Sequence, residues 1–77
     1  MLSIIIVHYD TSGELRECLQ SLSDVPDFIE ILVVDNDSPS TVDVPRGIVE
    51  KHPRMRWLAM DSNLGFGAAV RAGVEAS

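Results

Sequence analysis

The 77-residue sequence has one cysteine, few basic residues and no apolar run of membrane-spanning length. Because Cys18 stands alone, the chain can form neither an internal disulfide nor a zinc site built from several cysteines. We expect Cys18 to be a small core residue on the apolar face of a helix. The first apolar run ends at Val7 with no basic segment before it, so we expect neither a signal peptide nor a transmembrane segment, and a cytoplasmic location.

Acidic residues outnumber basic ones by twelve to six, which gives a formal charge of −6 at pH 7. This balance, without any cluster of lysine and arginine, argues against a nucleic-acid partner, because a phosphate backbone requires positive charge. A chain of this size buries only about 60% of the surface that its unfolded form exposes. We therefore expect residues 1–77 to form a single small domain of marginal stability.

Short apolar runs alternate with helical spacing along the chain, and turn residues separate them. The run Ile29–Val34 predicts a strand buried on both faces, with Glu30 as its only polar interruption. A capping box at Thr11–Glu14, followed by apolar residues at helical spacing, predicts an amphipathic helix. The expected elements are a strand at 2–9, a helix at 11–24, a strand at 29–35, a short helix at 45–51, a strand at 55–60 and a helix from 66 to the end.

This alternating βαβαβα order predicts a parallel sheet with right-handed crossovers. It corresponds to one half of a doubly wound, Rossmann-like α/β sheet. In such sheets, ligands bind in the crevice outside the carboxyl ends of the strands. We therefore expect a functional site in the segments that follow the three strands.

Those three segments carry polar residues and glycines: His8-Tyr9-Asp10, Asp35-Asn36-Asp37 and Asn63-Leu64-Gly65-Phe66-Gly67. Acidic side chains suit hydrogen bonds to a ribose or a base, an aromatic ring suits stacking, and glycine amides at a helix start suit phosphate. Together they predict a nucleotide site. Each segment also has an ordinary interpretation, because aspartate and asparagine often cap helices and glycines often form tight turns.

Other chemistry stays open at these positions. Asp35 and Asp37 have the Asp-x-Asp spacing that often holds a divalent metal, but no third ligand accompanies them. His8 is either a catalytic base or a partly buried residue at a strand end, and Arg71 is either a phosphate ligand or a solvated charge. No nucleophile and base can be paired from two histidines and one cysteine, so we assign no catalytic residue.

The ordered combination of segments resembles the N-terminal part of family 2 glycosyltransferases, and in particular their rhamnosyltransferase-like members. The resemblance covers essentially the whole chain and is carried by Ser3–Tyr9, Leu15–Leu22, Ile31–Ser38 and Asn63–Gly67. It implies the first part of a GT-A fold. It also implies an enzyme that transfers a sugar from a nucleoside-diphosphate donor to an acceptor hydroxyl.

The resemblance further implies roles for single residues in nucleotide binding. Asp35 would accept a hydrogen bond from the base. The residues bordering the base would be Val7, His8, Tyr9, Asp35 and Asn36, and those along the ribose and diphosphate would be Asn63, Gly65 and Gly67.

In this family the metal-binding Asp-x-Asp, the catalytic base and the acceptor site follow a fourth strand, so we expect them outside residues 1–77. The complete enzyme would use a divalent metal, Mg or Mn, whose ligands would not include Asp35 and Asp37. The chain alone should then be catalytically inactive. Two features depart from the family pattern: prolines at 39 and 45 follow the second strand, and Arg71 stands where asparagine is more common.

The family's strand order places the fourth strand beside the first, and the last helix of this chain on the face opposite the first two helices. Ile4–Val7 would then form an open apolar edge, with which a second copy could pair as a homodimer. The alternative function is therefore a non-enzymatic mononucleotide-binding or self-assembling module. The complete enzyme could also work at the membrane surface, although no membrane segment is expected in this chain.

Overall fold

The computed structural model of the chain describes residues 2–10, 12–38 and 43–77. Strands and helices alternate in the predicted βαβαβα order, which confirms the α/β class. No helix in this described part is long and apolar enough to cross a membrane. The elements are β1 (Leu2–His8), α1 (Ser12–Ser21), β2 (Ile29–Asp35), α2 (Asp43–Lys51), β3 (Met55–Ala59) and α3 (Phe66–Ala76).

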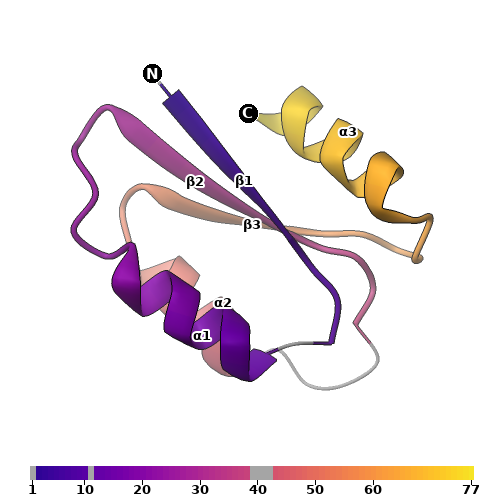
Figure 1. Ribbon diagram of the computed structural model, residues 1–77, viewed down its shortest axis with the longest axis horizontal. Helices are drawn as coiled ribbons and strands as arrows, with labels where there is room; N and C mark the ends of the chain where they lie inside the picture. Colours follow the sequence, from indigo (N-terminus) through magenta and orange to yellow (C-terminus); the bar gives the residue numbers. More distant parts are fainter. Residues whose placement is uncertain (1, 11, 39–42) are drawn as a thin grey trace.

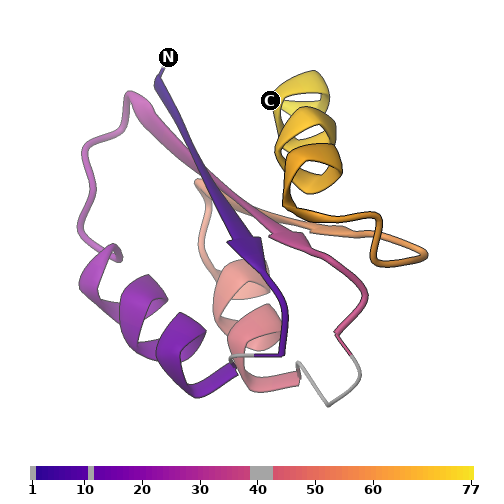
Figure 2. The same cartoon turned by 45° about the vertical axis from the view of Figure 1, so that its right-hand side comes forward.

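The three strands form one parallel sheet in the order β1-β2-β3, with β2 in the centre (Figure 1). Helices α1 and α2 cover one face and α3 covers the other, as Figure 2 shows. This arrangement confirms a Rossmann-like half sheet with its last helix on the opposite face. Ile31–Val34 in β2 are at most 1% exposed, because helices cover both faces of the central strand.

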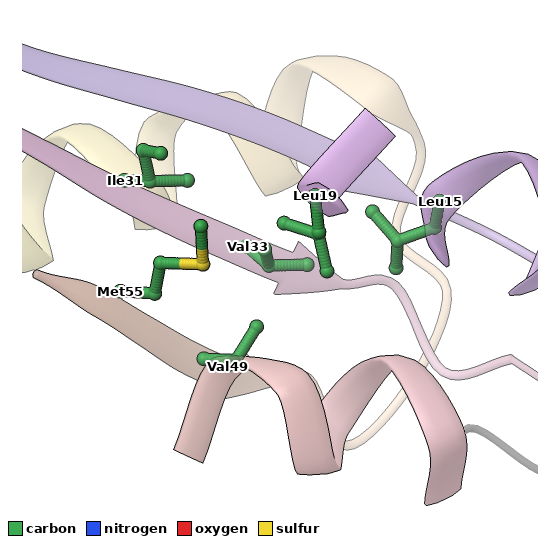
Figure 3. Packing of buried hydrophobic residues seen from close by; sticks show 6 residues of the cluster. All are labelled: Leu15, Leu19, Ile31, Val33, Val49 and Met55. Carbon is green, nitrogen blue, oxygen red and sulfur yellow. The ribbon is translucent and has the colours of Figure 1, made fainter. Parts of the chain in front are cut away.

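The larger core lies between the sheet and the two helices α1 and α2 (Figure 3). Leu15 and Leu19 reach it from α1, and Val49 reaches it from α2. Residues two apart on a strand share a face, so alternate side chains of β2 enter this core and the others face α3. The six buried side chains drawn in Figure 3 are Leu15, Leu19, Ile31, Val33, Val49 and Met55.

The second core lies under α3, which packs very closely on β1 and β2. A Cβ atom on Gly73 would lie only 2.7 Å from Ile5 Cγ2 and 3.1 Å from Val34 Cγ2. The absence of a side chain at Gly73 is therefore what lets the helix approach the sheet. The other small residues of this helix, among them the buried Ala69, also allow close packing.

Several element boundaries differ from the predictions by one to three residues, whereas both ends of β2 agree. Strand β1 ends at His8 instead of Tyr9, and β3 ends at Ala59 instead of Met60. Helix α1 ends at Ser21 instead of residue 24, where serine hydroxyls donate hydrogen bonds to carbonyls of the last helical turn. Helix α2 begins two residues before Pro45, because proline is tolerated in the first turn of a helix.

The prediction that Cys18 is a core residue is wrong, because its side chain is exposed. The buried stripe of α1 is centred on Leu15 and Leu19, with Leu22 packed against the same core, and Cys18 lies beside that stripe. The apolar spacing predicted the helix correctly, but the buried stripe does not include Cys18. The predicted capping box involves Thr11, which lies outside the described residues.

Candidate functional site

The segments that follow the strands meet at one edge of the sheet. The last residues of the strands are aligned across the sheet, with His8 beside Asp35 and Asp35 beside Ala59. Hydrogen bonds join the segments: the Asp10 N–H donates to Ser38 Oγ at 2.8 Å, and the Met60 N–H donates to the Asp35 carbonyl at 2.8 Å. The polar segments that the sequence predicted at the ends of the three strands therefore lie together at this edge of the sheet.

Each of these segments contains one residue with a left-handed backbone. The φ angles are 54° at Asp10, 58° at Asp37 and 95° at Gly65. Aspartate is enriched in this region of backbone space and glycine enters it without steric cost. Asp10 and Asp37 each stand two residues after the end of a strand, so the chain changes direction directly beyond the ends of β1 and β2.

His8 and Asp35 lie side by side on the face that α1 and α2 cover. Their neighbours two residues earlier, Ile6 and Val33, belong to the core on that face. His8 is 2% exposed and Asp35 is 7% exposed. The His8 ring lies 6.2 Å from the Trp57 ring, tilted by 59°, which places the histidine as a packed residue below the edge.

Ser38 holds the carboxylate of Asp35. Its Oγ donates to Asp35 Oδ1 at 2.5 Å and accepts from the Asp10 N–H at 2.8 Å. The serine thus connects the end of the central strand to the segment after β1. A short hydrogen bond to a carboxylate is among the stronger kinds in proteins. Sequence reasoning gave Ser38 no role of its own, although its place three residues after Asp35 is typical of a side chain that folds back on a turn.

Asn36 connects the end of the central strand to the segment before α3. Its Nδ2 donates to Asn63 Oδ1 at 3.0 Å, and the Gly65 N–H donates to the same oxygen at 3.0 Å. Because a backbone N–H can only donate, the Asn63 atom must be oxygen and the facing Asn36 atom must be nitrogen. Asn36 is 4% exposed, and within the described residues its Oδ1 has no hydrogen-bond partner.

The first turn of α3 presents backbone amides at this edge. Gly65 is the N-cap residue and makes no capping hydrogen bond through a side chain. A Cβ on Gly65 or Gly67 would have nothing within 4 Å, so no other atom crowds either backbone position. Helix N-termini carry a partial positive charge, and this one is open to an anion.

Tyr9 and Val7 meet the edge in different ways. Tyr9 is 47% exposed and is therefore available to a planar ligand. Val7 is half-buried against the α3 core. In β1 the even-numbered residues bond to β2, as Leu2 and His8 show, so the backbone N–H and C=O of Val7 point to the edge of β1 that pairs with no other described strand.

The two acidic residues of the Asp-x-Asp sequence do not form a metal site. Asp35 is held by Ser38 below the edge, whereas Asp37 is exposed on a left-handed turn. Within the described residues, no three side chains of histidine, cysteine, aspartate or glutamate lie close enough together to hold a metal ion. The described donors at this edge therefore do not fit a divalent metal.

The model for the glycosyl transferase family 2 domain matches residues 3–77. Two curated proteins are similar to the chain, each an N-acetylglucosaminyl-diphospho-decaprenol L-rhamnosyltransferase of Mycobacterium tuberculosis, from strains CDC 1551 / Oshkosh and ATCC 25618 / H37Rv. Each is 34% identical over 71 residues, which make up 91% of this chain. The chain corresponds to 22% of the length of each of these relatives.

Proposed function

The chain belongs to glycosyltransferase family 2, and on that premise we propose that it is the nucleotide-binding part of an enzyme that transfers a sugar from a nucleoside-diphosphate donor to an acceptor hydroxyl. The observation that carries this proposal is the pair Asp35 and Asn36 at the end of the central strand. Both are more than nine-tenths buried. Asn36 donates to Asn63 in the segment after β3, and Asp35 accepts from Ser38, which in turn accepts from the Asp10 N–H in the segment after β1. Polar side chains held in this way at the carboxyl edge of a parallel sheet are typical of a ligand site.

In the proposed complex, Asp35 accepts a hydrogen bond from an N–H of the base. The exposed ring of Tyr9 stacks on the base, and the backbone of Val7 borders it from the free edge of β1, beside His8. Asn36 offers its unpartnered Oδ1 to a donor such as a ribose hydroxyl. The remaining contacts, along the ribose and diphosphate, come from Asn63, Gly65 and Gly67 at the open start of α3.

The chemistry of transfer then belongs to parts of the enzyme outside residues 1–77. Because the donor set at this edge does not fit a metal, the divalent ion that we expect on the diphosphate, Mg or Mn, needs ligands from elsewhere. The names of the relatives suggest an L-rhamnosyl donor and an acceptor of the N-acetylglucosaminyl-diphospho-decaprenol kind for the whole protein. We also propose a cytoplasmic location, because a chain whose single cysteine forms no internal disulfide suits a reducing compartment.

Calorimetric titration with uridine and thymidine diphosphates, with and without Mn²⁺, tests this proposal. Asp35→Ala should weaken binding by about 10- to 100-fold, the value of one hydrogen bond to a charged group. Asp24→Ala is the matched control, because it removes the same charge from the exposed turn before β2. Binding that Asp35→Ala leaves unchanged would remove the role given to that residue. Sugar transfer by the 77-residue chain alone would show that its catalytic residues lie within it.

A second candidate function is a self-assembling module that pairs through β1. Within the described residues β1 bonds only to β2, and its other edge is open. Leu2 and Phe28 are 57% and 61% exposed at the start of this strand and of β2. Sedimentation at several concentrations distinguishes the two functions, because a stable dimer favours assembly and a monomer favours the enzyme fragment.

A further inference from the structure

We propose that Ser38 is a positioning residue of the nucleotide site, because its hydroxyl holds the carboxylate of Asp35 in the orientation that binds the base. This inference rests on the proposed function, since it requires that Asp35 contacts the base. The nucleotide-binding residues implied by the family resemblance do not include Ser38. Its side chain acts through Asp35 and needs no contact of its own with the nucleotide.

The hydroxyl of Ser38 has one partner that donates and one that accepts. The Asp10 N–H can only donate, so Ser38 Oγ accepts from it at 2.8 Å. The single hydrogen of the hydroxyl then points at Asp35 Oδ1, which lies 2.5 Å away and can only accept when ionised. An ionised carboxylate has about four acceptor positions, and Ser38 fills one of them. The hydrogen bond therefore leaves Asp35 able to accept from a ligand, and what it fixes is the direction in which the carboxylate faces.

The direction of the Asp35 carboxylate matters because little of this residue reaches the surface. Only 7% of it is exposed, so a rotation of the carboxylate would turn the part that a ligand can reach away from the edge. The last torsion of an aspartate side chain is broad and has no strong preference of its own. A short hydrogen bond to the charged oxygen supplies that preference.

The second partner of Ser38 depends less on the hydroxyl. The hydrogen bond between Ser38 and the Asp10 N–H lies at the exposed surface, where a water molecule can replace the hydroxyl as acceptor. The hydrogen bond to Asp35 is partly buried. Removal of the hydroxyl should therefore change the orientation of the carboxylate more than it changes the segment after β1.

Calorimetric titration with uridine diphosphate tests this role. Ser38→Ala lets the carboxylate rotate, so nucleotide binding must immobilise it and affinity should fall about 2- to 10-fold. In a chain that already carries Asp35→Ala, the same serine substitution should have no further effect. N3-methyluridine diphosphate has no ring N–H for Asp35, so Ser38→Ala and the unmodified chain should bind it equally. Ser23→Ala is the matched control, because it removes a serine hydroxyl that donates to a carbonyl between α1 and β2, and it should leave every affinity unchanged.

The comparison of the two nucleotides separates positioning from a general loss of structure, which would weaken the binding of both alike. Thermal unfolding of each variant measures stability separately. Unchanged affinity of Ser38→Ala for uridine diphosphate overturns this inference alone. An equal fall with and without Asp35→Ala, or an equal fall for both nucleotides, overturns it as well, because the serine would then act independently of the carboxylate. If no nucleotide binds, or if Asp35→Ala binds as the unmodified chain does, the proposed function fails and this inference fails with it.

Discussion

Replacing Gly73 with alanine should destabilise the chain, even though alanine is the better helix former. The added Cβ would lie 2.7 Å from Ile5 Cγ2 and 3.1 Å from Val34 Cγ2, well inside the ordinary contact distance of about 3.5–4.0 Å. Both neighbours are β-branched and have few rotamers to choose from. Helix α3 must therefore move away from the sheet, and such overpacking costs about 1–3 kcal/mol.

The matched control is Gly47→Ala in α2, where a Cβ would have nothing within 4 Å. Alanine gains about 1 kcal/mol over glycine inside a helix. Since both variants receive this gain, the difference between their free energies of unfolding isolates the packing cost. We expect Gly73→Ala to be less stable than Gly47→Ala by about 1–3 kcal/mol.

Urea unfolding followed by far-ultraviolet circular dichroism measures this difference by linear extrapolation. In thermal unfolding, each kcal/mol should appear as a shift of about 4–8 °C for a domain of this size. Equal stabilities of the two variants would refute the close approach of α3 to the sheet.

Further predictions concern the core, the exposed thiol and two hydrogen-bonded side chains. Leu19 is fully buried and Cys18 is exposed, so Leu19→Ala should cost about 2–5 kcal/mol in urea unfolding and Cys18→Ala less than about 0.5 kcal/mol. Equal losses would contradict the orientation of α1. A thiol reagent should modify Cys18 without denaturant. A thiol that reacts only after unfolding would show that Cys18 is buried in the core. Asn63→Ala removes an acceptor shared by two donors and should cost about 1–3 kcal/mol in thermal unfolding, whereas exposed Ser62→Ala should have no effect. Arg56→Gln should cost at most about 1 kcal/mol, because the Arg56 side chain is half exposed in its ion pair with Glu30, and salt at about 1 M should abolish much of the difference.

The order and type of the elements could be read from local patterns. Ile31–Val34 are apolar on both sides of the strand, which is typical of a parallel strand covered by helices on both faces, and β2 is buried in this way. Prolines and serines limited the helices to short segments. The predicted end of α1 was too late, because the Ser21 hydroxyl donates to a carbonyl of the last helical turn. The predicted start of α2 was also too late, because Pro45 is tolerated in the first turn of that helix.

The candidate site was predictable as a set of residue types but not as a set of contacts. Parallel strands bring their carboxyl ends to one edge, so the sequence alone placed Asp35, Asn36 and Asn63 near one another. It could not show that Asn36 bonds to Asn63, or that Ser38 joins Asp35 to the backbone of Asp10. These contacts connect residues 27 and 28 positions apart and depend on the registers of the strands.

By itself, the sequence determined the α/β class, the burial of the second strand on both faces and the edge at which polar residues collect, because each follows from short-range periodicity. Only the tertiary structure decided which side of α1 is buried, and so exposed Cys18. It also decided how closely α3 approaches the sheet at Gly73. Both depend on the distance and rotation between packed elements, which local periodicity does not specify.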